Sequence, residues 1–301
     1  MSRRLVAVLA VIFAVLCLAA ALAWLHAGGQ NKTVVHFTPD PPAAGSSAAP
    51  ESLPAPAEKN ESVKTNTANV PKPLPNVAPE LAFAPVSGEV LEFTSSVAKV
   101  SNVATLRLSV NGKKEIGGKE AWHLQALAHT QNPLRMVFEL DDQFDSYSDA
   151  GNMSSLQYEM HLNERGQKVD SVQRMLPSVQ DPPPDGASAV RVLPGTRDPL
   201  GMLQFLRSVD WSKTPEVRSP VYDGRKLYDT RATVSTSAAA VTVPAGKFTA
   251  TKIEIRVFDN GTEMKDAHFF LYLANDAART PVLMEAVLPV ATARVELTKA
   301  K

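Results

Sequence analysis

Two histidines come closest to metal-ligand chemistry in this sequence. His123 and His129 lie six residues apart in a run that predicts a β-strand over 121–130, so both side chains point to the same face of the strand. At about 3.3 Å per residue they are roughly 20 Å apart. That distance is too great for one zinc ion, and no third ligand follows at a suitable spacing. The sequence therefore predicts no metal site.

An acidic stretch follows these histidines, formed by Asp141, Asp142, Asp145 and Asp149. A calcium-binding loop of the EF-hand type needs a glycine near its middle and a glutamate at its twelfth position. The stretch lacks the glycine, and Leu156 stands at the twelfth position counted from Asp145. We expect the four aspartates to form a solvated strand edge and turn.

The sequence carries no signature of covalent catalysis. There is no Gly-x-Ser-x-Gly elbow, and the only cysteine, Cys17, lies in the N-terminal apolar run. Gly117-Gly118 indicates a hairpin turn rather than a phosphate-binding loop. A pair of carboxylates for glycoside hydrolysis cannot be picked from spacing, because any two can meet in a fold. We expect a non-enzymatic protein with no catalytic residue and no cofactor.

A predicted strand over 266–273 carries apolar or aromatic residues on both faces. A strand buried on both sides either packs beneath a helix or lines an enclosed cavity. The first interpretation places it under a helix predicted over 198–209. The second makes three of its residues a site for an apolar ligand such as a lipid or acyl chain. These candidate ligand-binding residues are His268, Phe270 and Tyr272.

Short runs of alternating apolar and polar residues dominate the chain after Gly88, and this alternation is typical of half-buried strands. Asn111-Gly112 and the run from Pro244 to Gly246 have the composition of tight turns. The predicted strands cover 89–97, 105–110, 121–130, 134–140, 155–163, 168–175, 226–235, 251–258, 266–273, 281–288 and 294–298.

One helix interrupts the strands. Asp198 is a good N-cap and Pro199 suits the first helical position, where its missing N–H costs nothing. An apolar face follows over 200–206, so we expect a plug or lid over one end of the sheet. The whole pattern predicts an all-β domain over 87–301, an antiparallel curved sheet or barrel, or a sandwich, with one short helix.

The charge of this domain argues against nucleic acid as a partner. The chain has 31 basic and 31 acidic residues. Six basic and five acidic residues precede Gly88, which leaves 25 basic and 26 acidic residues in the domain. A net charge near −1 gives no overall attraction to phosphate.

The N-terminal 26 residues have the pattern of a transmembrane segment. Arg3 and Arg4 precede an uncharged run over 5–25, and about 21 helical residues span the ~30 Å hydrocarbon core. The positive-inside rule places Met1 in the cytoplasm and the rest of the chain across the inner membrane. Cleavage after Ala21 or Ala23 is the alternative, which would release a soluble periplasmic protein.

Residues 27–86 are rich in proline, alanine, serine and asparagine and almost lack aromatic residues. Such a segment buries too little apolar area to offset its ordering entropy, so we expect a disordered, partly extended tether. No cysteine follows Cys17, and the exported domain must therefore be stabilised by a packed core rather than by internal disulfides.

Six residue runs, taken in order over roughly 88–299, resemble the bacterial family called domain of unknown function 3108. The resemblance implies an exported antiparallel β domain and no known reaction. Tyr272 replaces a tryptophan often found before the Asn-Asp run. The runs are Gly88–Phe93, Phe144–Tyr147, Arg197–Leu200, Tyr222–Lys226, Val243–Phe248 and Asn275–Val282.

Three hypotheses for function follow. The first is a membrane-tethered periplasmic domain that binds a lipid-like or protein component of the envelope. The second is a scaffold that positions partners through the tether over 27–86. The third, an envelope hydrolase, requires a cleft of carboxylates or a Ser–His pair.

Overall fold

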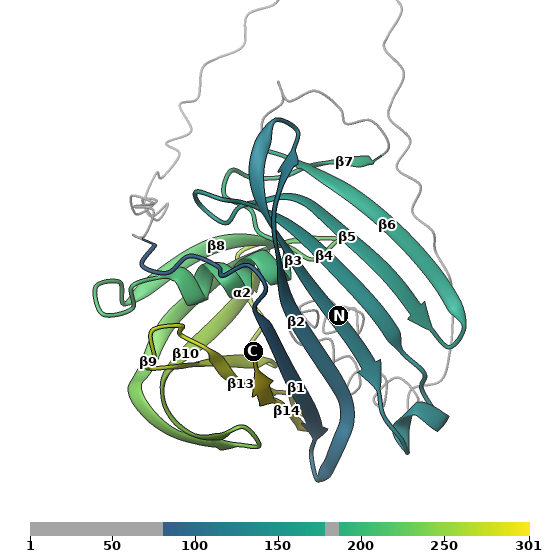
Figure 1. Cartoon of the computed structure of the whole chain (residues 1–301), viewed down its shortest axis with the longest axis vertical. Coiled ribbons are helices and arrows are strands. Elements are labelled where there is room, and N and C mark those ends of the chain that lie inside the picture. The colour runs from purple at the N-terminus through teal and green to yellow at the C-terminus, as the bar shows by residue number, and fades with distance from the viewer. Residues whose placement is uncertain (1–80, 178–186) are drawn as a thin grey trace, which may run out of the picture. The chain divides into compact units, whose positions relative to one another are not determined.

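The computed structural model describes residues 81–177 and 187–301 (Figure 1). The predicted membrane segment and the tether up to residue 80 lie outside the described residues. Within the described ranges, none of the helices is long and apolar enough to cross a membrane.

In the part of the chain that the structure describes, the strands form one curved sheet that wraps around one α-helix, α2 (Figure 1). Its order is β7-β6-β5-β4-β3-β2-β1-β14-β13-β12-β10-β9-β8, with β11 paired to β10. All pairs are antiparallel except β6 with β7. The strands are β1 (Val90–Val97), β2 (Val100–Ile116), β3 (Lys119–Thr130), β4 (Asp141–Asp149), β5 (Ser155–Glu164), β6 (Gln167–Leu176), β7 (Ser188–Arg191), β8 (Glu216–Tyr222), β9 (Leu227–Val243), β10 (Gly246–Asp259), β11 (Thr262–Glu263), β12 (His268–Ala274), β13 (Pro281–Val287) and β14 (Thr292–Ala300).

The prediction of a mostly β domain with one short helix is confirmed, and the sheet is single and open. The two edge strands of the order, β7 and β8, do not pair with each other among the described residues. Side chains near the two edges nevertheless meet, because Gln173 Nε2 on β6 donates to the Gly224 carbonyl in the turn after β8, at 3.0 Å. Gly224 has φ +92°, and a Cβ there would lie 2.5 Å from Met160 Sδ, so this approach requires glycine.

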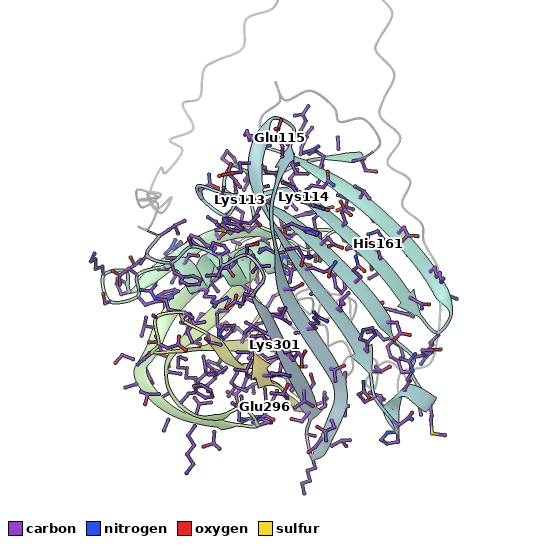
Figure 2. All side chains as sticks on the ribbon, viewed as in Figure 1. Lys113, Lys114, Glu115, His161, Glu296 and Lys301 are labelled. Carbon is purple, nitrogen blue, oxygen red and sulfur yellow. The ribbon has the colours of Figure 1, made fainter. Side chains whose placement is uncertain are left out.

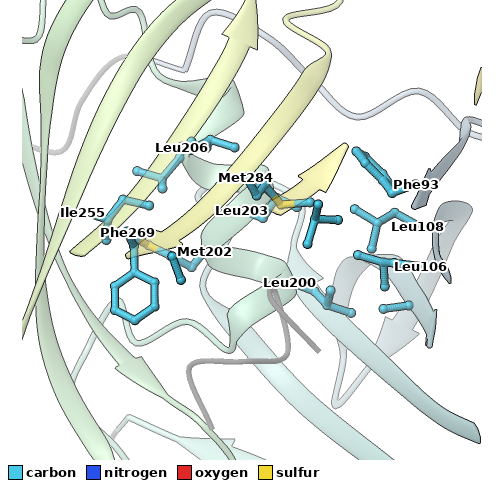
Figure 3. Packing of buried hydrophobic residues seen from close by; sticks show 14 of the residues in the cluster. Phe93, Leu106, Leu108, Leu200, Met202, Leu203, Leu206, Ile255, Phe269 and Met284 are labelled. Carbon is cyan, nitrogen blue, oxygen red and sulfur yellow. The ribbon is translucent and has the colours of Figure 1, made fainter. Parts of the chain in front are cut away.

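Helix α2 (Pro199–Ser208) begins as the sequence predicts and is buried along its whole length. Burial on every side is typical of a core helix rather than of a surface lid. In Figure 3 the helix contributes apolar side chains toward both halves of the sheet. The labelled residues of this core are Phe93, Leu106, Leu108, Leu200, Met202, Leu203, Leu206, Ile255, Phe269 and Met284.

The N-terminus of α2 is held by a buried carboxylate. Asp198 Oδ1 accepts hydrogen bonds from the Leu200 and Gly201 N–H groups, both at 2.9 Å. Its Oδ2 accepts from the hydroxyls of Ser146 and Ser155, both at 2.5 Å. Burial raises the pKa of the Asp198 carboxyl, and these four hydrogen bonds oppose that shift. The cap therefore also fixes the helix to β4 and β5.

The last turn of α2 is held by a buried ion pair. Arg207 donates through both terminal nitrogens to the Glu89 carboxylate, at 2.5 and 2.6 Å. Its Nε donates to the Ala278 carbonyl at 2.9 Å, and its guanidinium lies 4.7 Å from the centre of the Phe83 ring. One side chain thus joins the helix to the segments before β1 and before β13. Sequence analysis did not identify this pair.

Two of the predicted local structures are wrong. Residues 134–140 form no strand, because the N–H groups of Val137 and Phe138 bond to the Leu134 carbonyl and close a 3₁₀ turn over Leu134–Met136. Asn111-Gly112 is no hairpin turn, because β2 continues through it with a shift of register between Val110 and Lys113. Strand β8 was not predicted; it contains Pro220, which an edge strand tolerates.

The acidic stretch is also not a solvated edge. β4 lies between β3 and β5; Asp141, Asp145 and Asp149 share one face of the sheet, and Asp142 lies on the other. Asp142 points to the helix side, where it is 4 % exposed and accepts a hydrogen bond from the Asn163 N–H at 2.8 Å. Burial raises the pKa of Asp142 to about 7.

Breaking the Glu89–Arg207 pair should destabilise the domain strongly. Arg207→Met leaves a largely buried carboxylate without its partner, which costs about 3–5 kcal/mol of unfolding free energy. The matched control is Arg218→Met, which removes an exposed pair with Glu216 and should cost less than about 1 kcal/mol. Urea denaturation followed by tryptophan fluorescence measures both. Equal losses in the two variants would contradict the anchoring role.

Asp142 should make the domain less stable as the pH rises. A carboxyl whose pKa is raised in the folded state binds more protons there than in the unfolded chain, so stability falls between about pH 4 and pH 7. Asp142→Asn should flatten this slope, whereas the control Asp229→Asn, at an exposed position of β9, should not. Unfolding free energies at several pH values provide the measurement, and an unchanged slope in Asp142→Asn would refute the assignment.

Candidate functional site

The polar side chains of this domain gather on the face of the sheet opposite α2, which we call the outer face. On β3 the odd-numbered residues from His123 to His129 point to this face, while Leu124, Ala126 and Ala128 point to the core. The same alternation continues on the neighbouring strands, from β14 through β6. Two features stand out there, a groove and a cluster of ionisable side chains.

The groove lies over β14, β1, β2 and β3 and has a volume of about 380 Å³. This volume falls within the roughly 300–1,000 Å³ of pockets that bind small ligands. Glu92 and Arg107 stand directly opposite each other on β1 and β2, so the groove offers both charges side by side. Its lining consists of Glu92, Phe93, Thr94, Thr105, Leu106, Arg107, Leu127, His129 and Thr298.

An ion-pair network borders the groove at His129. Arg135 donates to both oxygens of Asp141, at 2.8 and 2.7 Å, and His129 Nδ1 lies 2.9 Å from Asp141 Oδ1. The hydrogen bonds from Arg135, reinforced by His129, lower the pKa of Asp141 to about 2. Asp141 is therefore ionised at neutral pH and orients the imidazole of His129.

The ionisable cluster centres on Asp145, which is 3 % exposed although it lies on the outer face. His123 Nε2 lies 2.6 Å from Asp145 Oδ1, and Gln125 donates to the same oxygen at 2.9 Å. Gln143 donates to Oδ2 at 2.6 Å. Burial raises the pKa of Asp145, but the hydrogen bonds, led by that from His123, outweigh it and lower the pKa overall. The carboxylate is thus held ionised in a buried position.

Strand β5 brings a second carboxylate and a second imidazole to the cluster. Glu159 stands opposite Asp145 in the β4–β5 register, and His161 Nε2 lies 3.5 Å from Glu159 Oε2. On its other side, His161 Nδ1 lies 2.7 Å from Asp170 Oδ1, and this hydrogen bond raises the pKa of His161. Figure 2 shows His161 among the strands of this half of the sheet. Single ligand atoms of Asp145, Glu159 and His161 all lie within 4.8 Å of one another.

The structure confirms that His123 and His129 share one face, and it assigns them to different partners. Each imidazole meets an aspartate of β4, His123 meeting Asp145 and His129 meeting Asp141. The sequence prediction considered ligands along one strand only. The neighbours of His123 come from β4 and β5, whose register cannot be read from spacing.

The three predicted ligand-binding residues lie on the outer face of the other half of the sheet. Tyr272 donates its hydroxyl hydrogen to Glu285 at 2.7 Å, and Lys252 Nζ lies 4.0 Å from the centre of the Phe270 ring. His268 is exposed at the start of β12. Phe269 and the other inward residues of β12 pack in the core with α2 (Figure 3). The binding of an apolar ligand by His268, Phe270 and Tyr272 stays a prediction.

A cavity between α2 and the sheet is small. It measures about 30 Å³ and lies beside Arg207 and Gln204, whose buried amide nitrogen has no hydrogen-bond partner. A space of this size holds on the order of one water molecule. The core next to the helix is therefore packed rather than hollow.

Solved structures with a similar arrangement have low sequence identity to this chain. A β-barrel-like protein of domain of unknown function DUF1849 from Brucella abortus is 12% identical, with a TM-score of 0.49, over 73% of this chain and 99% of that one. A candidate lipoprotein from Parabacteroides distasonis is 12% identical, with a TM-score of 0.36, over 74% and 99%. A candidate exported protein with a YmcC-like fold from Bacteroides fragilis is 11% identical, with a TM-score of 0.32, over 74% and 99%.

A comparison with curated proteins found no match. A comparison with protein families found a match to the family described as "Protein of unknown function (DUF3108)", whose model matches residues 92–298. The match covers more than half of the chain and nearly all of the β domain. On this ground the chain belongs to the DUF3108 family of proteins of unknown function.

Proposed function

We propose that this chain is a non-enzymatic binding domain of the bacterial envelope, which receives a protein component of the envelope in the groove on its outer face. Residues 5–25 would tether it to the inner membrane, with the β domain in the periplasm. The observation that carries the proposal is the contrast between the groove of about 380 Å³ and the interior cavity of about 30 Å³. Of these two spaces, only the outer groove is large enough for a partner.

The groove offers charged and hydroxyl groups beside its apolar lining, and these groups can fix an extended ligand. Arg107 and Glu92 supply opposite charges, and three threonines add hydroxyl groups along the strands. Specific sites commonly fix a ligand by a few placed polar groups of this kind. An acyl chain would need an apolar enclosure instead. A peptide segment of an envelope protein fits this chemistry better.

The alternatives have weaker support. An apolar ligand at His268, Phe270 and Tyr272 would meet a tyrosine hydroxyl already bonded to Glu285 and a lysine lying over the Phe270 ring. A scaffold role rests on the tether over 27–86, which lies almost wholly outside the described residues. An envelope hydrolase needs an accessible carboxylate, whereas Asp145 is buried and its oxygens accept several hydrogen bonds.

Crosslinking in cells tests the groove. A photo-crosslinking residue at Leu127 should form one discrete protein adduct, and Arg107→Glu should reduce it roughly tenfold, the effect of about 1.4 kcal/mol of lost affinity. The matched control places the same residue at Arg218, an exposed position on β8. Adducts of equal yield at both positions would contradict the proposal. An adduct with the mass of a lipid would favour the apolar-ligand alternative.

The tether is tested separately through topology. A phosphatase reporter that folds only outside the cytoplasm, fused after Lys301, should be active, and Arg3→Glu with Arg4→Glu should reduce its export because the positive-inside signal is lost. Lys32→Glu, on the opposite side of the apolar run, is the control and should change nothing. The mass of the purified chain shows whether the N-terminal segment has been cleaved. A chain that begins at Leu22 or Trp24 would be the soluble form rather than the anchored one.

A further inference from the structure

Two imidazoles and two carboxylates converge on the outer face, from three adjacent strands. His123 comes from β3, Asp145 from β4, and Glu159 and His161 from β5. The ligand atoms of the last three lie within 4.8 Å of one another, and His123 Nε2 lies 2.6 Å from Asp145 Oδ1. Asp145, Glu159 and His161 thus bring three potential ligands, of the types that transition metals prefer, to one point, and His123 adjoins them through Asp145.

The two carboxylates stand in a position that favours a cation between them. Asp145 and Glu159 are direct cross-strand neighbours, and like charges at such positions destabilise a sheet. Gln125, Gln143 and Gln157 donate to these carboxylates but are neutral, so they satisfy hydrogen bonds without balancing charge. A divalent cation at the centre would balance both carboxylates at once.

The imidazole of His161 is oriented as metal-binding histidines are. Its Nδ1 bonds to Asp170, whose side chain is 74% exposed and which lies outside the group of three potential ligands. This bond directs Nε2 toward Glu159. Metal-ligating histidines almost always have such an outer carboxylate or carbonyl on the second nitrogen.

The second imidazole, that of His123, is buried beside the group of three potential ligands. The His123 side chain is 9% exposed and stacks on the Tyr147 ring at 4.7 Å. Its Nδ1 is buried without a hydrogen-bond partner, while its Nε2 points at Asp145. The contact of His123 Nε2 with Asp145 orients this carboxylate from outside the group of three potential ligands.

We propose that Asp145, Glu159 and His161 form a binding site for a divalent transition-metal ion of the zinc type, with His123 orienting Asp145. One imidazole nitrogen and two carboxylate oxygens suit a zinc ion with three protein ligands and an open fourth position. Calcium and magnesium take oxygen ligands and would be poorly served by an imidazole. Asp170 orients His161 and is not itself a ligand.

Zinc titration of the full-length chain in detergent tests the site. Zinc chloride is added in competition with a chromophoric chelator, after prior removal of metal. The wild type should bind one zinc per chain. Asp170→Asn, an exposed change that leaves the core intact, should weaken binding roughly 10- to 100-fold, the usual effect of losing an outer-shell partner. Glu159→Gln and His161→Gln remove ligands and should weaken it further.

The matched control is His129→Gln, which removes an imidazole from the same face of the same strand. His129 is 46% exposed and bonds to Asp141, outside the cluster, so zinc affinity should stay unchanged. Zinc should also raise the thermal unfolding midpoint of the wild type and of His129→Gln, but not of His161→Gln. A wild type that binds no zinc, or zinc binding lost in His129→Gln and retained in His161→Gln and Glu159→Gln, would overturn the proposal.

Discussion

Helix α2 is buried on every side. The fold of the domain depends on hydrogen-bond partners for the backbone groups at the two ends of this helix. The first N–H groups of a helix and its last carbonyls have no partner within the helix. Burying these groups without hydrogen-bond partners would cost more free energy than the burial of the apolar face of so short a helix provides. Asp198 meets this requirement at one end, in a position that is fully buried, through two backbone and two hydroxyl hydrogen bonds. At the other end, Trp211 Nε1 donates to the Leu206 carbonyl and the Ala82 N–H donates to the Ser208 carbonyl, both at 2.7 Å. Arg207 in addition anchors the last turn by its pair with Glu89.

These anchors explain why the sheet is curved and why its interior is filled. Asp198 binds to β4 and β5, whereas Arg207 binds to residues before β1 and before β13. The helix is thus attached to both halves of the sheet, which are themselves joined by the pairing of β1 with β14. The sheet must bend around the helix to allow this. Because the helix occupies the interior, the groove of about 380 Å³ lies on the outer face.

The sequence predicted those parts of the fold that depend on local chemistry. The cap at Asp198, the hairpin at Gly117-Gly118 and most strands follow from the residue at a position and its close neighbours. Predictions failed where non-local pairing decides the outcome. The sequence predicted an exposed edge at the aspartates of β4. This prediction failed because their burial depends on β3 and β5 on either side. Strand β8 was missed, because Pro220 is acceptable only at an edge, and the edge is a property of the whole sheet.

The same limit applied to the outer-face site. His123 was considered with His129, its neighbour along the strand, and set aside because the two are too far apart. Its actual neighbours lie 22 residues away on β4, at Asp145, and further along on β5. Only the register of three strands brings them together, and a shift by one residue would turn each side chain to the opposite face. The spacing of histidines along a single strand therefore carries little information about ligation across a sheet.

The ionisable cluster is hard to explain by stability alone. Replacing a buried set of charges by apolar residues of similar volume is often neutral or stabilising. The outer face at β3 to β5 does not support the helix, since the anchors of α2 lie on the inner face of these strands. Asp145 is 3 % exposed and lies beside a second carboxylate and two imidazoles. Burying a charged group at this position costs more free energy than burying an apolar one. Function rather than folding is the better reason for its presence.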